Sequence, residues 1–274
     1  MKIDSARLMK ALKWILGIGI ILFSVAPIYS SLLIALTPSV NVMEAQLYPK
    51  YWAFDNFSKA FRLIRPHLVN SFIYSIVTVL CTLAITIPPA YIIARYRFRF
   101  KKVLIFSILL TQMIAGIVLL PSLYQFFNRI HLINTSHGLV LTLIGLNLAL
   151  TVWLLLGFFA SLPREIEEAA IVEGAGFVTV LFRFVVPMAA PGIAVSAIFT
   201  FINAYNEFAA PLFLLTDAGK HPLTMRLYSF LSDVTIQWEM VGSSAIIGMI
   251  PPVLIFLFFQ QYIIKGLTVG AVKS

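Results

Sequence analysis

The sequence predicts an all-α, polytopic membrane protein with six transmembrane helices. Its 274 residues are 60% hydrophobic and 11% charged, and their mean hydropathy is +0.95. Soluble domains carry about 25% charged residues, so this composition indicates that lipid is the solvent. The apolar residues also form continuous runs of about 20 residues, the length of a helix that crosses a bilayer. A membrane β-barrel would instead show short segments of alternating polarity.

Six apolar runs give the order of the expected spans. The first run is too long for the apolar region of a signal peptide and has no convincing cleavage site, so we expect an uncleaved span. We find no internal repeat, and we expect residues 1–274 to form a single transmembrane permease domain with a long connection at residues 161–191. The spans lie near 14–36, 68–94, 103–127, 138–160, 192–215 and 241–264.

The basic residues divide unevenly between the two sides that six spans would create. Thirteen of the 20 Lys and Arg residues lie in the N-terminal stretch, in residues 95–102, beside the acidic residues 165–173 and in the C-terminal tail. Cytoplasmic loops collect Lys and Arg, so we assign both termini and the acidic stretch to the cytoplasm. A net charge of +9 would indicate nucleic acid in a soluble protein. Here it follows the membrane topology, and we expect no nucleic-acid partner.

The connection at 161–191 predicts a helix–turn–helix. It holds four of the 11 acidic residues within nine positions. Ser161 is placed to cap a short helix, and the glutamates of the first two turns would complement the helix dipole. Gly174 and Gly176 would end this helix, because glycine adopts the left-handed conformation of a sharp turn. A second helix would begin near Phe177, and Pro187 would stop or kink the chain before the next span.

Two interpretations of this hairpin stay open on the residues alone. It could be a solvated connector whose acids merely stabilise the helix start. It could instead be a docking element, in which Ile166, Ala169 and Ala170 form one small, smooth face. An acid beside that face would then pair with an Arg or Lys of another protein.

The acidic stretch is part of a longer motif. Glu168-Ala169-Ala170, three residues, Gly174, nine residues and Phe184-x-Val186-Pro187 follow one another in register. This motif resembles the EAA loop of importer permeases in ABC transporters. Further segments resemble the carbohydrate branch of that family, of the maltose permease G type: Pro89 through Phe98, Asn206-Glu207-Phe208, Leu215-Thr216-Asp217 and Lys265 through Lys273. Many members carry proline where Ala115 stands, so we expect the kink of the third span to differ.

The resemblance implies the permease subunit of an ATP-driven importer in a prokaryotic cell (inner) membrane. Its substrate would be a sugar, an oligosaccharide or a related polyol delivered by an extracytoplasmic solute-binding protein. The other implied partners are a second, homologous permease, two ATP-binding cassette subunits and the lipid bilayer. The chain would not be an enzyme and would hold no cofactor or metal, because ATP and Mg²⁺ would bind to the ATPase subunits. It has no phosphate-binding loop of its own.

The resemblance also assigns two groups of residues to contact with the ATPase subunits. Glu168 would form a salt bridge with a basic residue, the small residues would fit a surface cleft, and the tail would reach between the two ATPase subunits. The coupling residues would be Glu168, Ala169, Ala170, Glu173, Gly174 and Pro187. The tail residues would be Gly266, Leu267, Thr268, Gly270 and Lys273.

Polar residues inside the predicted spans are candidates for a translocation path. Glu207 lies in the fifth predicted span with Asn203 and Asn206 within one turn, and Gln112 lies in the third. A charged residue inside a membrane is energetically costly, so one interpretation gives these polar residues a functional role. The other interpretation is that they form hydrogen bonds between helices. A stand-alone secondary transporter or channel is the alternative function, although such folds usually contain inverted repeats.

Overall fold

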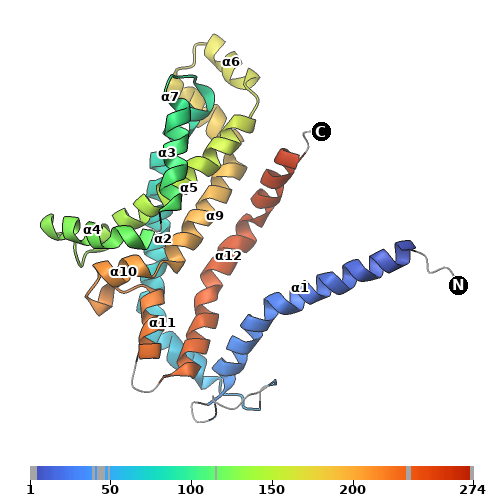
Figure 1. Cartoon of the computed structure of the whole chain (residues 1–274), viewed down its shortest axis with the longest axis vertical. Coiled ribbons are helices and arrows are strands. Elements are labelled where there is room, and N and C mark those ends of the chain that lie inside the picture. Colours follow the sequence, from blue (N-terminus) through green and yellow to red (C-terminus); the bar gives the residue numbers. More distant parts are fainter. Residues whose placement is uncertain are drawn as a thin grey trace. The chain divides into compact units, whose positions relative to one another are not determined.

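The computed structural model describes residues 5–38, 41, 47–48, 50–114, 116–232 and 236–271, and every regular element among them is a helix (Figure 1). In lipid, a helix satisfies all its own backbone hydrogen bonds, and the apolar runs fold accordingly. The elements are α1 (Ser5–Leu36), α2 (Asp55–Arg95), α3 (Lys101–Met113), α4 (Gly116–Arg129), α5 (Ser136–Ser161), α6 (Glu165–Val172), α7 (Phe177–Thr179), η2 (Val180–Val185), α8 (Val186–Met188), α9 (Ala190–Asn206), α10 (Ala209–Leu214), η3 (Ala218–Lys220), α11 (Leu223–Ser232) and α12 (Trp238–Ala271).

The structure supports four to six membrane spans. Among the described residues, four helices are long and apolar enough to cross a bilayer, and six spans result if each of two bent helix pairs counts as one. The all-helical membrane fold is therefore confirmed, whereas the number of six spans, the cytoplasmic position of the termini and the coupling role of the hairpin stay predictions. The four single helices contribute the segments Leu12–Leu36, Asp55–Arg95, Ser136–Ser161 and Trp238–Tyr262.

The third predicted span, 103–127, corresponds to two helices joined by a sharp bend. The chain forms α3 and α4, whose axes are bent by 93°. Gly116 begins α4, and a Cβ atom there would come within 2.8 Å of Leu146 Cδ2, so glycine lets α4 pack closely on α5. Pro121 lies inside α4 and not at the break. Ala115, where we expected the kink to differ, lies outside the described residues.

The fifth predicted span, 192–215, is also interrupted. α9 ends at Asn206, and α10 begins at Ala209 after two non-helical residues. Pro211 explains this break, because a helix that ran through it would need the N–H that proline lacks and would press its ring against the carbonyl of Glu207. The second bent helix pair lies before this break in the chain. It consists of Phe177–Met188 and α9, which meet at an angle of 78° and could together form one span.

Two compact units make up the chain. The first comprises residues 1–65 and 226–250, and the second comprises residues 66–225 and 251–274. The second unit carries α3 to α10 together with parts of α2, α11 and α12. The expectation of one transmembrane domain stays a prediction, and the candidate site lies wholly in the second unit.

The first unit packs the C-terminal end of α1 closely against the start of α12. Asn56 Nδ2 donates to the carbonyl groups of Ala35 (2.9 Å) and Thr37 (3.1 Å), so acceptors at the end of α1 find partners. Gly242 faces the backbone of α1, and a Cβ atom there would lie 2.9 Å from the oxygen of Ser31. Glycine therefore sets how near these two helices approach.

The second unit is built on the packing of α9 against α5. A Cβ atom on Gly192 would overlap the ring of Phe158, at 2.2 Å from its Cγ, so glycine brings the start of α9 onto α5. Deeper in the same interface, the hydroxyl groups of Thr151 and Thr200 are hydrogen-bonded at 3.0 Å, and both residues are buried. Such hydrogen bonds hold helices together where lipid offers no hydrophobic driving force.

Candidate functional site

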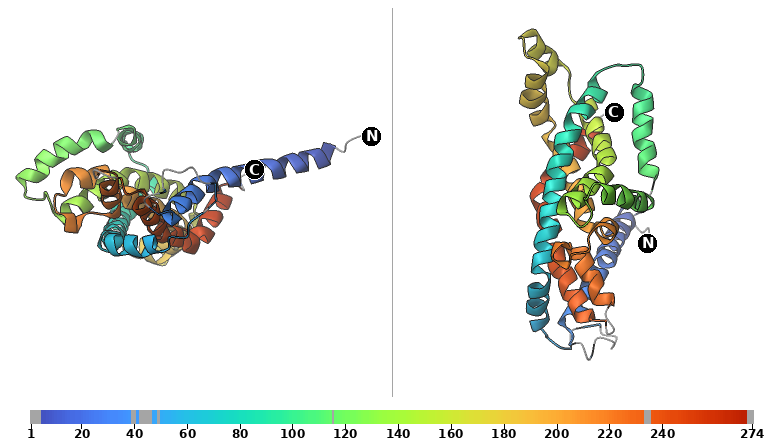
Figure 2. Two further views of the ribbon diagram at one scale, coloured as in Figure 1. Left: turned by 90° about the horizontal axis from the view of Figure 1, so that it is seen from below. Right: turned by 90° about the vertical axis from the view of Figure 1, so that its left-hand side faces the viewer.

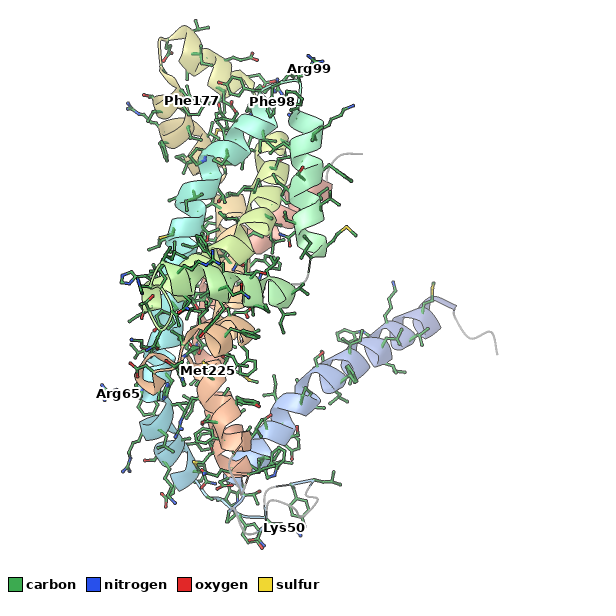
Figure 3. The ribbon with its side chains drawn as sticks, turned by 60° about the vertical axis from the view of Figure 1, so that its left-hand side comes forward. Lys50, Arg65, Phe98, Arg99, Phe177 and Met225 are labelled. Atoms are coloured by element: carbon green, nitrogen blue, oxygen red, sulfur yellow. The ribbon has the colours of Figure 1, made fainter. Side chains whose placement is uncertain are left out.

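A helix–turn–helix occupies residues 165–188, at the place where the sequence predicts one. After α6, Gly174 adopts φ of 86°, a conformation that suits glycine. Its N–H donates to the carbonyl of Ile171, and the N–H of Ala175 donates to that of Ala170, both at 2.9 Å. The chain then turns into α7, so α6 and α7 form a hairpin beyond the ends of α2 and α5 (Figures 1 and 2). Figure 3 labels Phe177 at the same end as Phe98 and Arg99.

The predicted cap of α6 is wrong. Ser161 is the last residue of α5, and its hydroxyl donates to the carbonyl of Phe158 at 2.8 Å. α6 begins after Arg164, which has helical dihedral angles and offers no side-chain cap. The apolar run of α5 simply continues further than expected, and the chain leaves the helix at Leu162, before Pro163, since the residue before a proline disfavours the helical conformation.

The hairpin exposes most, but not all, of the residues predicted to contact an ATPase subunit. Glu168, Ala169, Glu173, Gly174 and Pro187 are exposed. Ala170 is 5% exposed and belongs to the buried core beneath the hairpin. The prediction of one smooth contact face that includes Ala170 is therefore wrong, because Ala170 lies about 100° around the helix from Ala169 and is covered by the core beneath the hairpin.

Large apolar side chains crowd the exposed tip of the hairpin. Ile171 is 57% exposed, Val172 is 87% exposed, and Val178 on α7 is 66% exposed. Exposed apolar patches rimmed by polar residues mark sites of protein or membrane contact. The acids Glu168 and Glu173 lie on the same short helix–turn segment, so the tip combines apolar contact with negative charge.

A buried charge pair fastens the hairpin to the end of α2. The side chains of Arg95 and Glu167 are 7% and 8% exposed, and Arg95 Nη2 contacts Glu167 Oε1 as an ion pair outside hydrogen-bond geometry. Arg95 Nη2 also donates to the carbonyl of Leu162 at 3.0 Å. Tyr91, one turn earlier on α2, donates its hydroxyl to Glu167 Oε2 at 2.8 Å. One basic residue thus holds both the start of the connection and its first helix.

The ring of Tyr91 is the centre of an aromatic group around this charge pair. It packs edge-on against Phe159 of α5, with ring centroids 5.9 Å apart, and against Phe177 of α7 at 5.8 Å. Leu181 and Val185 of η2 are fully buried in the same core. Three segments of the chain therefore meet on the end of α2.

Sequence reasoning missed Arg95, Tyr91 and Glu167 as site residues. Tyr91 and Arg95 stand four positions apart on a helix, so they share a face. That spacing was a usable signal, but the partner lies more than 70 positions away along the chain. We assigned the ATPase contact to Glu168, and not to Glu167, because Glu168 begins the Glu-Ala-Ala motif. A sequence does not show which of the two side chains is buried.

Three of the four candidate translocation residues line one cavity of about 550 Å³ between α4, α5 and the end of α9. Asn203, Asn206 and Glu207 lie on its wall together with Asn147. Asn203 Nδ2 donates to Asn147 Oδ1 at 3.3 Å, and Asn147 is buried. Three amide groups and a carboxylate therefore face aliphatic side chains across a cavity large enough for a small polar solute.

Glu207 lies at the break between α9 and α10, and not within a helix as the sequence suggested. Its Oε1 accepts from the N–H of Ala210 at 3.0 Å, which satisfies a donor at the start of α10. Its carbonyl accepts from the hydroxyl of Thr224 at 2.9 Å. The carboxylate of Glu207 therefore complements the positive end of α10 at this break.

The remaining predicted residues lie elsewhere or cannot be placed. Gln112 lines a different, mostly apolar groove with α5 residues. The tail positions 266–270 continue α12 as helix, and their side chains lie outside the described residues, as does Lys273. Among the residues that the structure describes, no group of three or more His, Cys, Asp or Glu could hold a metal ion.

The fold and this hairpin define a class of membrane transport subunit. Residues 86–269 match the family described as binding-protein-dependent transport system inner membrane component. This range covers more than half of the chain, and the chain belongs to that family. It is therefore a multi-pass component of a transport system, and inner-membrane location follows from the family description.

Curated relatives and a solved structure extend the match over the chain. The trehalose transport system permease protein SugB of Mycobacterium tuberculosis is 32% identical over 263 residues, which cover 94% of this chain and 95% of SugB. The trehalose/maltose transport system permease protein MalG of Thermococcus litoralis is 32% identical, covering 76% of this chain and 75% of MalG. One chain of a bacterial ABC transporter involved in alginate import has the same fold, with TM-score 0.81 at 21% identity over 96% of this chain and 99% of its own.

Proposed function

We propose that the chain is the membrane-spanning permease subunit of an ATP-driven ABC importer for a sugar, an oligosaccharide or a related polyol. Membership of the binding-protein-dependent family supports the importer, and the names of the trehalose and maltose relatives support the carbohydrate class. The chain would catalyse no covalent chemistry. ATP and Mg²⁺ would bind to separate ATPase subunits.

The proposed assembly contains a second, homologous permease, two ATPase subunits and an extracytoplasmic solute-binding protein. The uneven distribution of Lys and Arg supports a cytoplasmic position for both termini and for the hairpin at 165–188. That position would let the hairpin meet the ATPase subunits. The C-terminal residues 266–273 would extend toward the same subunits from the end of α12, and no nucleic acid would take part.

The tip of the hairpin carries this proposal. Ile171, Val172 and Val178 are exposed beside Glu168 and Glu173, and the base of the hairpin is fixed by buried contacts. Such a tip fits an apolar socket with a basic rim on another protein. Closure of the ATPase pair on ATP would then move the hairpin and swing the spans from inward-open to outward-open. Ala170, which is buried, would contribute by anchoring and not by contact.

The cavity beside α9 is the proposed part of the translocation path. Asn203 and Asn206 can donate to and accept from hydroxyl groups, and Glu207 can accept from them. We expect Asn206→Leu to lower solute uptake while ATPase assembly persists. Gln112→Leu is the matched control, because Gln112 lines a different groove. Equal uptake by both variants would remove this cavity from the path.

Reconstituted vesicles test the function directly. The purified permease pair, ATPase subunits, binding protein and radiolabelled trehalose should give uptake only when ATP is enclosed with the ATPase subunits. Uptake that proceeds without nucleotide would favour a stand-alone secondary transporter or channel.

A charge reversal tests the docking tip. Glu168→Arg should abolish co-purification of the ATPase subunits, because it would place like charge against the proposed basic rim. Glu165→Arg is the matched control, since Glu165 is also exposed on α6 but lies a turn further from the tip. Survival of ATPase association in Glu168→Arg would contradict the docking role of that residue.

A further inference from the structure

Two adjacent glutamates of α6 differ in their exposure. Glu168 is exposed on the outer side of the helix, whereas the side chain of Glu167 is 8% exposed and faces the end of α2. The two acids therefore serve different partners. Glu168 is available to another protein, and Glu167 is already engaged within this chain.

The inner acid is held from two sides by a single helix. Arg95 contacts one oxygen of Glu167 as an ion pair, and Tyr91 donates to the other oxygen at 2.8 Å. Both residues come from the last two turns of α2, and Arg95 also donates to the carbonyl of Leu162 ahead of α6. A carboxylate with a fixed partner on each oxygen cannot rotate freely, so α6 and the end of α2 should move as one body.

Apolar packing alone does not explain this arrangement. A buried ion pair stabilises a fold poorly, and well-packed apolar residues of similar volume often do as well or better. The surrounding core, with Ala170, Leu181 and Val185 buried against α2, already attaches the hairpin. The charge pair fixes the orientation of α6 relative to α2, because it joins the carboxylate of Glu167 to the guanidinium group of Arg95.

We propose that Arg95 and Glu167, oriented by Tyr91, are positioning residues that transmit movement of the hairpin to α2. The proposal rests on the proposed importer function, in which the hairpin receives movement from the ATPase subunits. Glu168 makes the contact with the ATPase subunit, and Glu167 passes the displacement into the bundle. Since coupling between two sites is reciprocal in binding free energy, the same link also carries the signal of the solute-binding protein back to the ATPase subunits.

The opposite end of α2 gives this signal a route. Within the second unit, Asn70 of α2 donates to the carbonyl of Gly219 at 2.8 Å, and Tyr74 donates to that of Lys220 at 3.0 Å. The segment at 215–221 is thus attached to the helix that also holds Glu167. Residues 70 and 95 are about 37 Å apart along a helix that rises 1.5 Å per residue, so α2 spans the bilayer between the two attachments.

The assembled complex in lipid nanodiscs tests the link. In wild-type complex, solute-loaded binding protein should stimulate ATP hydrolysis. The apolar pair Arg95→Met with Glu167→Leu should fold and retain its ATPase subunits, yet lose at least tenfold in stimulation and in solute transported per ATP. Glu167→Gln alone should show the same uncoupling, and the exchanged pair Arg95→Glu with Glu167→Arg should recover at least half of the stimulation.

The outcomes separate the possible failures. Full stimulation in the folded apolar pair would overturn the link, because packing alone would then suffice. Loss of ATPase subunits from that pair would also overturn it, since the two glutamates would then share one role. If Glu167→Gln does not reach the membrane, the apolar pair gives the answer. Wild-type complex without ATP-dependent uptake would instead contradict the proposed importer function.

Discussion

The two ends of the second unit hold their connecting segments by different means. At one end, the hairpin 165–188 is attached through buried side chains, chiefly Arg95, Glu167 and the ring of Tyr91. At the other end, the segment 215–221 is attached through its backbone groups, which bond to polar side chains of other segments. The first attachment depends on a few side-chain atoms and fixes the orientation of the hairpin. The second is distributed over many hydrogen bonds and fixes a shape.

Asn134 shows how the second attachment works. It adopts φ of 57°, and its N–H donates to the carbonyl of Leu214 at 2.8 Å. Its Oδ1 accepts from the N–H groups of Thr216 (3.1 Å) and Asp217 (2.9 Å). Its carbonyl accepts from Lys220 Nζ at 2.8 Å. Asn134 therefore forms four hydrogen bonds with residues 214–220, through its backbone N–H, its backbone carbonyl and its side-chain oxygen.

The comparison teaches that the attachments should fail in different ways. Removing one member of a buried ion pair leaves the other charge without a partner in a place that water does not reach. Removing one member of an exposed hydrogen bond lets water take its place. Substitutions at the hairpin end should therefore cost more stability than substitutions at the other end.

Glu167→Ala should give the largest effect. It leaves Arg95 buried without its carboxylate, and such a loss costs about 3–5 kcal/mol. The midpoint of thermal unfolding of the detergent-solubilised protein should fall by many degrees. Hydrogen exchange should become faster throughout residues 165–188 while residues 215–221 stay protected.

Two controls sharpen that result. Glu165→Ala changes the same residue type on the same helix, but Glu165 is exposed, so its effect should stay within about 0.5 kcal/mol. The apolar pair Arg95→Met with Glu167→Leu should recover most of the stability. A stability loss for Glu167→Ala as small as that for Glu165→Ala would mean that the ion pair does not hold the hairpin.

Asn134→Ala should have the next largest effect, at about 2–3 kcal/mol. The substitution removes two exposed hydrogen bonds to the segment 215–221, together about 1 kcal/mol, and forces alanine into a left-handed conformation, which costs about 1–2 kcal/mol. Asn134→Gly keeps the conformation accessible and should lose only the bonds. Faster exchange at Thr216 and Asp217, with residues 165–188 unchanged, would confirm that the two ends are attached independently.

Gly174→Ala should cost about 1–2 kcal/mol, because φ of 86° suits glycine and strains any residue with a Cβ atom. No atom lies within 4 Å of the position of that Cβ, so crowding adds nothing. Gly157→Ala on α5 is the control, since it also has open space but lies in a regular helix. Stability equal to or above that of wild type in Gly174→Ala would show that the turn is not fixed by its glycine.

The sequence predicted those features of the fold that depend on neighbouring residues in the chain. The long apolar runs predicted α1, α2, α5 and α12, because length and hydropathy suffice to define a span. Gly174 predicted the turn, because a left-handed residue is a property of one position. The acidic and alanine motif predicted a short helix, and α6 forms there.

Features that need a distant partner were not predictable in the same way. Which of Glu167 and Glu168 faces inward depends on where Arg95 lies in space, and a sequence shows no such direction. The break at Glu207 had a local signal in Pro211, and the prediction of the fifth span did not use it. The cavity that joins Asn147 to Asn203 exists only after α5 and α9 have packed.

Acidification should give the smallest effect and separate the two ends without a mutation. The pKa of His221 lies below its ordinary value of 6.5, because burial disfavours the charged ring and the neighbouring His67 acts in the same direction. The unfolded chain therefore binds a proton more readily than the folded one. Stability at the 215–221 end is complete above pH 6.5 and declines as the pH falls below it.

Asp217 does not confuse this measurement. Its pKa is lowered from 3.8, first by the N–H of Gly219 and then by Lys220, so its contribution is lost only in stronger acid. Hydrogen exchange, corrected for its intrinsic pH dependence, should show loosening of residues 215–221 between about pH 7.5 and pH 5.5, with residues 165–188 unaffected. His221→Gln should abolish the difference. If both ends loosen together in the wild-type protein, the stability of one attachment depends on the other, and the contrast between the two ends fails.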